Sequence, residues 1–158
     1  MSPALKRFGE VRVNAGERLL VVDLAGCTGM DSTFMGTLAG LAIKLEKAGG
    51  GAVQVAGVSP RNRQSLEDLG LDCLLEIEPQ AAVWRDRVEA VRGDLRVLDE
   101  REFPEVAEAG ARHVLEAHRV LADSSAANRD KFRGVIEVLE AELADKQRGG
   151  RNTNPATP

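Results

Sequence analysis

A strand-like apolar run that leads into a capped helix constrains the fold of this chain most. Residues 19–24, Leu-Leu-Val-Val-Asp-Leu, show the nearly continuous apolar pattern of a strand that is covered on both faces. After a glycine-containing loop, Asp31-Ser32-Thr33 opens a segment with apolar residues three and four positions apart, which is typical of an amphipathic helix. This stretch is therefore predicted to place a serine hydroxyl at a helix N-terminus.

The alternation of strand and helix patterns continues along the chain. Three glycines at 49–51 end the first helix, and residues 52–58 have the pattern of the next strand. Ser59-Pro60 then begins a helix that ends before Gly70, and residues 71–77 have the pattern of a turn and a short last strand. Strand, helix, strand, helix and strand in succession predict an α/β unit with parallel neighbours.

The segments on either side of this unit are predicted to be helical. Residues 3–14 precede it, with apolar residues recurring every three positions. From Gln80 the chain becomes charged and alanine-rich, and its first part carries a heptad-like seam of Trp84, Val88, Val91, Leu95 and Leu98. Two further apolar stripes, separated by a break at residues 123–125, predict an antiparallel helical hairpin. These stripes are Val106, Val114, Ala117 and Leu121, after a start at Pro104, and Phe132, Val135, Ile136, Leu139 and Leu143.

Composition excludes several classes of function. Only 3% of the 158 residues are aromatic and the net charge is -4, so the chain lacks the stacking platforms and basic surface of a nucleic-acid binder. No apolar run approaches the length of a membrane span, and the N-terminus lacks the pattern of a secretory signal, so we expect a cytoplasmic protein without a membrane partner. In that compartment Cys27 and Cys73 are expected to be free thiols.

Neither a metal site nor a cofactor is predicted. His113 and His118 are five residues apart, which puts them on different faces of a helix, and we expect each to be an ordinary surface residue. The loop at 26–29 contains two glycines, but it lacks the lysine that follows in a phosphate-binding loop and the third glycine of a dinucleotide fingerprint. With no convergent acid, base or metal set in the sequence, an enzyme is not expected.

Two interpretations of Ser32 follow from local chemistry. Asp31 is a favourable N-cap, since its carboxylate can accept hydrogen bonds from the first free N–H groups of the helix, and Ser32 is then a bystander. Alternatively, Ser32 is a phosphate acceptor, which needs only a hydroxyl on a defined backbone that a kinase can reach. Nucleophilic catalysis is not expected, because no histidine lies within the α/β unit and no Gly-x-Ser-x-Gly elbow is present.

The spacing of these motifs resembles one known family. Leu20-Val21-Val22-Asp23-Leu24, Met30-Asp31-Ser32-Thr33, the strand at 53–58 and Leu66-x-x-Leu69-Gly70-Leu71 together resemble the STAS domain of bacterial anti-sigma factor antagonists. The resemblance implies an α/β fold with a STAS-like mixed sheet and flanking helices. We expect this domain at residues 1–79, a helical extension at 80–148 that ends in the hairpin, and a disordered tail at 149–158.

The resemblance also implies a function and a set of site residues. It implies a non-enzymatic switch in which Ser32, or alternatively Thr33, is phosphorylated by a partner anti-sigma factor that is itself a serine kinase. Only the dephosphorylated form would bind that partner and free a sigma factor. The partner-binding face would then comprise Asp31, Thr33, Phe34, Gly36, Thr37 and Gly40.

Two departures from the family pattern leave an alternative open. Phe34 puts a large ring where the family has a small residue, which favours a different partner or loss of kinase recognition. The chain also begins near a helix that one or two strands usually precede, and a missing strand would leave an unpaired sheet edge that favours homo-oligomers. The alternative function is therefore a degenerate STAS scaffold that is not phosphorylated and assembles through its helical hairpin.

Overall fold

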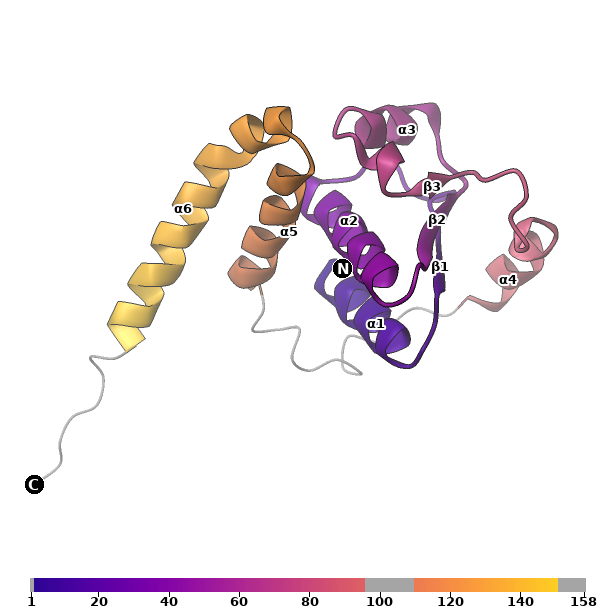
Figure 1. Ribbon diagram of the computed structural model, residues 1–158, viewed down its shortest axis with the longest axis horizontal. Coiled ribbons are helices and arrows are strands. Elements are labelled where there is room, and N and C mark those ends of the chain that lie inside the picture. Colours follow the sequence, from indigo (N-terminus) through magenta and orange to yellow (C-terminus); the bar gives the residue numbers. More distant parts are fainter. Residues whose placement is uncertain (1, 96–109, 151–158) are drawn as a thin grey trace, which may run out of the picture.

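The computed structural model of the chain describes residues 2–95 and 110–150 and arranges them in layers (Figure 1). A small sheet stands between helices α1 and α2 on one face and α4 on the other, and the hairpin of α5 and α6 lies on the far side of α2. The strands are β1 (Leu19–Asp23), β2 (Ala52–Ala56) and β3 (Glu76–Ile77). The helices are α1 (Ser2–Asn14), α2 (Ser32–Lys47), α3 (Pro60–Glu67), α4 (Val88–Asp94), α5 (Gly110–Ser124) and α6 (Ala126–Gly150), with single 3-10 turns at Leu71–Cys73 and Arg85–Arg87.

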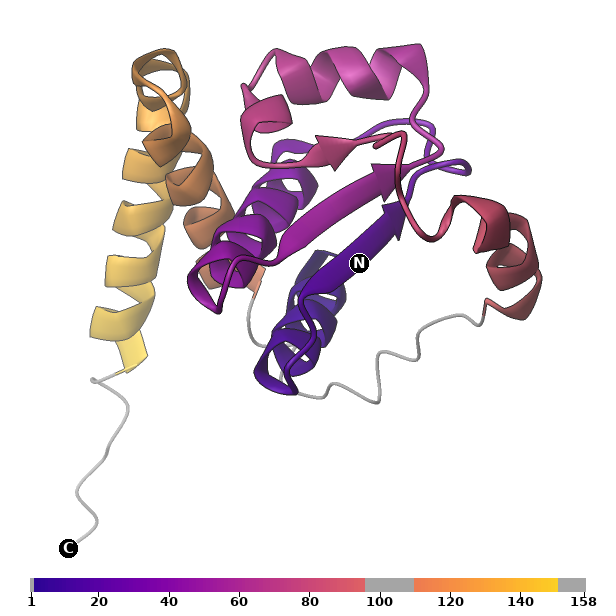
Figure 2. The ribbon, with the colours of Figure 1, turned by 45° about the vertical axis from the view of Figure 1, so that its right-hand side comes forward.

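The expected α/β fold is confirmed, and the described strands form a sheet of order β1-β2-β3. β1 pairs with β2 from Leu19↔Ala52 to Asp23↔Ala56, and β2 pairs with β3, both in parallel (Figure 2). The sheet was expected to be mixed, but both ladders are parallel in the described part of the chain. The reason is that a helix crosses over between each pair of strands, whereas the segment before β1 is the helix α1 and supplies no antiparallel neighbour.

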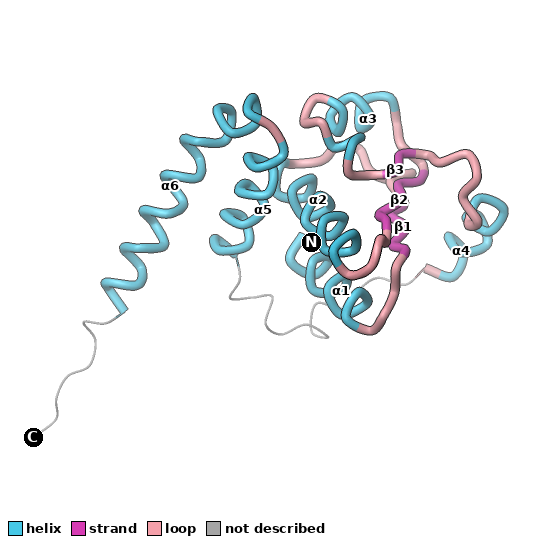
Figure 3. The backbone as a smooth tube through the Cα atoms, viewed as in Figure 1, coloured by secondary structure: helices cyan, strands magenta, loops and turns pink. Residues whose placement is uncertain are grey.

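Among the described strands β1 lies at the edge of the sheet, and one of its faces is only partly covered, which differs from the expectation of a strand covered on both faces. Leu20 and Val22 pack against the core, whereas Leu19 and Val21 are 37% and 41% exposed. Both α1 and α2 lie on one face of the sheet, and the short helix α4 covers little of the other (Figure 3). The apolar run therefore predicted a β-strand correctly, but it did not indicate whether one or both faces of that strand are covered.

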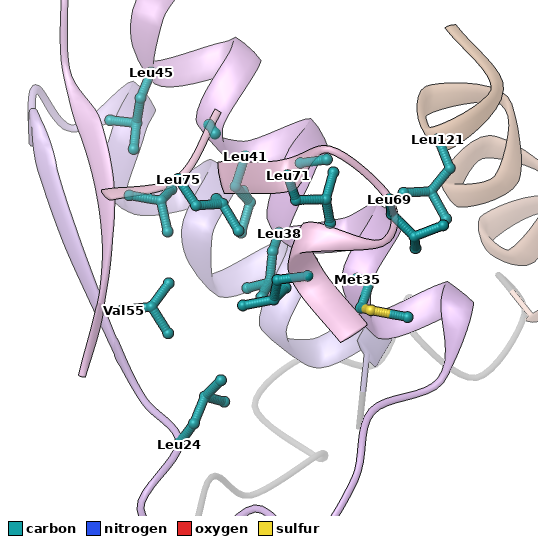
Figure 4. Close-up of a cluster of buried hydrophobic side chains, with 14 of the residues drawn as sticks. Leu24, Met35, Leu38, Leu41, Leu45, Val55, Leu69, Leu71, Leu75 and Leu121 are labelled. Carbon is teal, nitrogen blue, oxygen red and sulfur yellow. The ribbon is translucent and has the colours of Figure 1, made fainter. Parts of the chain in front are cut away.

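The core lies between the sheet and α2 and continues into the hairpin. Leu38 and Leu45 on the inner stripe of α2 are fully buried, as is Val55 on β2. Figure 4 shows Leu121 of α5 beside Leu69 at the end of this cluster, and Leu121 is itself fully buried. The α/β unit and the hairpin thus share one apolar cluster.

The predicted antiparallel hairpin is confirmed for the residues that the structure describes. Its turn is at Ser125, whose Oγ accepts a hydrogen bond from the backbone N–H of Asn128 at 3.1 Å. The buried side chain of Asn128 donates in turn to the Leu69 carbonyl oxygen at 2.8 Å, which ties the turn to the end of α3. The tail was expected to begin at Gly149, but α6 continues to Gly150, so this boundary is wrong by two residues. The expected helix start at Pro104, the stripe residue Val106 and the rest of the tail at 151–158 lie outside the described residues.

The heptad-like seam predicted from Trp84 to Leu98 is wrong where the structure describes it. α4 has only seven residues, and Val91 and Leu95 are 54% and 66% exposed. Polar contacts hold this segment instead: Trp84 Nε1 donates to Gln54 Oε1 at 2.6 Å, and the Arg92 guanidinium pairs with Asp23. Leu98 lies outside the described residues. No described helix combines the length and the apolar content needed to cross a membrane.

Candidate functional site

The predicted cap of α2 is confirmed. Asp31 has an extended backbone, with φ -89° and ψ 167°, and its Oδ1 accepts a hydrogen bond from the Phe34 N–H at 2.7 Å. The preceding loop is held by Asn62, whose side chain donates to the Cys27 carbonyl oxygen at 2.8 Å. Because Asp31 provides the capping oxygen, Ser32 enters the helix with its own hydroxyl free for another contact.

That hydroxyl meets a histidine of the hairpin. Ser32 Oγ lies 2.9 Å from His118 Nε2. The other ring nitrogen, Nδ1, lies 2.8 Å from the Val114 carbonyl oxygen, which can only accept, so Nδ1 carries the proton of the neutral ring. Nε2 is then the acceptor, and the Ser32 hydroxyl donates to it. The sequence places no histidine within the α/β unit, but this did not exclude one beside Ser32, because the hairpin supplies a histidine 86 residues away in the chain.

α5 approaches α2 closely at Gly36. A Cβ atom on this residue would lie 2.3 Å from the Ala117 carbonyl oxygen and 2.9 Å from the Ala117 Cα. These are backbone atoms of a helix and cannot rotate away as the end of a side chain would. Gly36 and Ala117 are both buried, so this pair of small residues allows the two helix backbones to touch.

A second histidine continues the contact one turn further along α2. Thr37 Oγ1 donates to the Thr33 carbonyl oxygen at 2.7 Å and lies 3.2 Å from His113 Nε2, which is therefore the protonated nitrogen. Burial lowers the pKa of His113 below its ordinary value of 6.5, with the Lys6 ammonium as a smaller cause in the same direction. Among the described residues, the buried Nδ1 of His113 has no hydrogen-bond partner.

Both histidines are 5% exposed, so the expectation of surface residues is wrong. Residues five apart on a helix point about 140° apart. If α5 were packed on one side only, one of the two histidines would be exposed to water. α5, however, is packed between α2 and α6 (Figure 1), and the His118 ring makes an edge contact with Phe132 of α6 at 5.4 Å between centroids. Burial on two sides of α5 accommodates both rings.

The structure brings together the proposed phosphorylation site, Ser32, and three of the residues proposed for the partner-binding face. Ser32, Gly36 and Thr37 contact α5 as described, and a Cβ on Gly40 would reach Val120 Cγ2 at 3.9 Å, an ordinary contact distance. Asp31 is exposed at the helix start, while the partly buried ring of Phe34 packs against the core cluster. The Thr33 side chain is also partly buried. We call the surface formed by Ser32, Gly36, Thr37 and Gly40 the α2 face.

Sequence reasoning missed His113, Ala117 and His118 as parts of this site. Ala117 was assigned to the apolar stripe of the hairpin, and that stripe was expected to face the other hairpin helix. A signal was nevertheless present, because Gly36 and Gly40 on α2 and Ala117 on α5 are the small residues that closely packed helices need. The local sequence patterns do not indicate that α2 packs against α5.

A cavity of about 260 Å³ lies between α1, α2 and α5. Thr37 and His113 are in its wall, and its rim carries two ion pairs, Lys6 with Glu116 and Lys44 with Glu10. Ser32 is not among its lining residues, so the Ser32–His118 pair does not open into this cavity. In the parts of the chain that the structure describes, no group of His, Cys, Asp or Glu side chains is arranged to hold a metal ion.

These features define a small parallel α/β domain with a capped serine at the start of its first crossover helix and a further helix packed on that site. Residues 1–76 match the family model described as "Mlab, STAS domain". The match confirms the resemblance to the STAS domain that the motifs indicated, for these 76 of the 158 residues. α4, α5 and α6 lie outside the matched range. Searches of the curated proteins and of the solved structures found no match.

Proposed function

We propose that this chain is a non-enzymatic regulatory module that binds a partner protein through the α2 face and is controlled by phosphorylation of Ser32. The observation that carries this proposal is that two different side chains cap α2 and contact α5. Asp31 caps the helix, and the Ser32 hydroxyl makes its hydrogen bond to a different helix. Ser32 is therefore not a second cap, and a change at its Oγ acts on whatever protein segment lies on the α2 face.

The chemistry of the switch is a phosphoryl transfer from ATP bound to the kinase. A bond forms between Ser32 Oγ and the γ-phosphorus, the bond from that phosphorus to the ADP oxygen breaks, and the hydroxyl proton goes to a base of the kinase. The product carries about 1.5 to 2 negative charges. The free N–H groups and dipole of the α2 N-terminus favour these charges, whereas Asp31 opposes them.

The proposed partner is an anti-sigma factor that is also a serine kinase, in the cytoplasm, and it binds only the unmodified form. Asp31, Thr33 and Phe34 would lie at the border of this contact, with Thr33 as the alternative phosphate acceptor. The match of residues 1–76 to the STAS family model supports a role in protein–protein interaction. The residues of the α2 face are uncharged and two of them are glycines, which supports a protein helix as the contacting element.

Phosphate mapping tests this function directly. The full chain is incubated with ATP and the cognate kinase, and its phosphopeptides are mapped by mass spectrometry, with Ser32→Ala and Thr33→Ala as matched variants. We expect phosphate on Ser32, loss of labelling in Ser32→Ala only, and loss of kinase binding in Ser32→Asp. Phosphate found only outside residues 31–37, or kinase binding that is the same for Ser32→Asp and the unmodified chain, contradicts the proposal.

The open edge of the sheet supports a second candidate function, a STAS scaffold that assembles with copies of itself. Val21 on β1 is 41% exposed, and Val138 on α6 is 58% exposed. If either surface assembles the protein, Val21→Lys or Val138→Lys dissociates the oligomer in sedimentation velocity, and the variant that acts identifies the surface. A chain that is monomeric at all concentrations excludes this candidate.

A further inference from the structure

Three of the four residues of the α2 face contact the chain's own helix α5, although part of the face also lines the cavity between α1, α2 and α5. Ser32 contacts His118, Gly36 contacts the Ala117 backbone, and Thr37 contacts His113. Two of these contacts are specific hydrogen bonds and the third excludes any side chain on Gly36. α5 therefore recognises the same features by which, under the proposed function, a partner would recognise this face.

We infer that the α2 face is a helix-docking surface and that α5 is its intramolecular occupant, so that a partner protein binds by displacing α5 and placing a helix of its own there. This inference rests on the proposed function for the partner, but the docking of α5 stands on the contacts alone. In this arrangement the C-terminal hairpin competes with the partner, and α5 partly covers the switch serine in the closed chain.

The contacts of α5 specify the chemistry of the helix that replaces it. A residue opposite Gly36 must be small, as Ala117 is, since the backbones approach within contact distance. The preceding residue, Glu116, pairs with Lys6 of α1. A hydrogen-bond acceptor is needed opposite Ser32, where His118 Nε2 now lies. The partner is accordingly a helix with an acidic residue, a small residue and an acceptor side chain in succession.

The closed arrangement requires an unmodified serine. Phosphorylation removes the O–H that donates to His118 and adds a bulky charged group at a contact of 2.9 Å. α5 and the partner therefore both compete for the unmodified α2 face, and modified Ser32 is compatible with neither in the observed geometry. Undocking of α5 is the step that exposes Ser32 to a kinase.

The test changes α5 and leaves the α2 face intact. Ala117→Leu enlarges a buried residue whose backbone contacts Gly36, and Arg112→Leu introduces the same residue at an exposed position of the same helix. Amide hydrogen exchange in the full chain is followed by mass spectrometry. We expect exchange in α5 to be at least tenfold faster in Ala117→Leu, with exchange in β2 unchanged, and Arg112→Leu to match the unmodified chain.

Equal protection of α5 in Ala117→Leu and in the unmodified chain overturns the inference. If Ala117→Leu also deprotects β2, the pair Gly36→Ala and Gly40→Ala decides the matter, because an added methyl group collides with α5 only at position 36. Faster exchange of α5 in Gly36→Ala alone then supports docking at this surface, and equal exchange in both variants contradicts it.

Kinase assays separate this inference from the proposed function. If α5 covers the switch, the rate of Ser32 phosphorylation by the cognate kinase is at least tenfold higher in Ala117→Leu than in Arg112→Leu. Equal rates overturn the covering role and leave phosphorylation established. No phosphorylation in any variant, together with faster exchange of α5 in Ala117→Leu, overturns the proposed function and leaves α5 docking in place.

Discussion

The carbonyl oxygen of Ala117 lies 2.3 Å from the position that a Cβ atom on Gly36 would occupy. Two helices that are 81 positions apart at these residues (117 minus 36) thus meet backbone to backbone. Glycine is costly inside a helix by about 1 kcal/mol relative to alanine, and at Gly36 the close packing of α5 offsets that cost.

Matched glycine substitutions on α2 therefore have opposite effects on stability. We expect Gly36→Ala to lower the free energy of unfolding by about 1–3 kcal/mol through overpacking, because the facing atoms belong to a helix backbone. Gly40→Ala raises it by up to about 1 kcal/mol, since its new methyl group meets Val120 at 3.9 Å. Urea denaturation followed by circular dichroism measures both. A stabilising Gly36→Ala would show that α5 does not pack there.

A negative charge at the first helical position should distinguish Ser32 from its neighbour. Ser32→Glu puts a carboxylate against His118, whereas Thr33→Glu adds the same charge one residue later without a described contact to α5. The helix dipole favours an acid at both positions, so a difference between them reflects the contact with α5. We expect faster amide exchange of α5 in Ser32→Glu only, measured at pH 7. Faster exchange in both variants would attribute the effect to charge rather than to position.

We expect the buried His113 to make the stability of the fold dependent on pH. Its pKa is lowered in the folded chain, so the neutral ring is favoured there, and the unfolded chain binds the proton more tightly. The contribution of neutral His113 to the free energy of unfolding is therefore complete above the ordinary pKa of 6.5. It is lost as pH falls from there through the lowered pKa of the folded chain. The charged groups around the ring are Lys6 and Glu10 on α1, Lys44 on α2 and Glu116 on α5.

Comparison of the unmodified chain with His113→Leu measures this effect. We expect the free energy of unfolding of the unmodified chain to fall between pH 7.5 and pH 5.5, and the fall to be smaller in His113→Leu. Denaturant titrations at fixed ionic strength give both slopes. Identical pH dependence in the two proteins would mean that His113 does not contribute.

Arg92 of α4 should control the ionisation of Asp23 at the end of β1. The Arg92 guanidinium donates to both Asp23 oxygens, at 2.7 and 2.9 Å, and these hydrogen bonds lower the pKa of the carboxyl below its ordinary value of 3.8. We expect Arg92→Ala to raise the Asp23 pKa toward that value, and Arg87→Ala to leave it unchanged. Carboxyl carbon shifts in an NMR titration report it. Because the folded pKa is depressed, the ion pair stabilises the fold above pH 3.8 and ceases to do so as pH falls through the lowered pKa.

Local patterns accounted for most of the secondary structure. The strands, α2 with its Asp31 cap and the hairpin break near Ser125 depend on residues within about one helical turn or one strand, and the sequence contains that information. The Ser32–His118 contact and the close approach of Gly36 to Ala117 depend on which helices pack together. Apolar periodicity identifies a buried face but not its neighbour, which is why His113 and His118 were placed on the surface and β1 between two layers.

Because Leu121 is fully buried in the shared core, we expect the hairpin and the STAS domain to unfold together. Leu121 comes from α5 but lies in the core cluster beside Leu69, so its truncation leaves a cavity at the boundary between the two parts. We expect Leu121→Ala to lower the free energy of unfolding by about 2–5 kcal/mol, and the unfolding of β2 and of α5, followed by hydrogen exchange in denaturant, to shift to the same extent. Val138→Ala, at a position that is 58% exposed on α6, is the control and should change stability by less than about 0.5 kcal/mol. The opposite result is a Leu121→Ala variant in which α5 opens at lower denaturant while β2 keeps the midpoint of the unmodified chain. It would show that the hairpin unfolds independently of the STAS domain. A partner helix could then replace α5 most easily while the hairpin is unfolded and the domain is still folded.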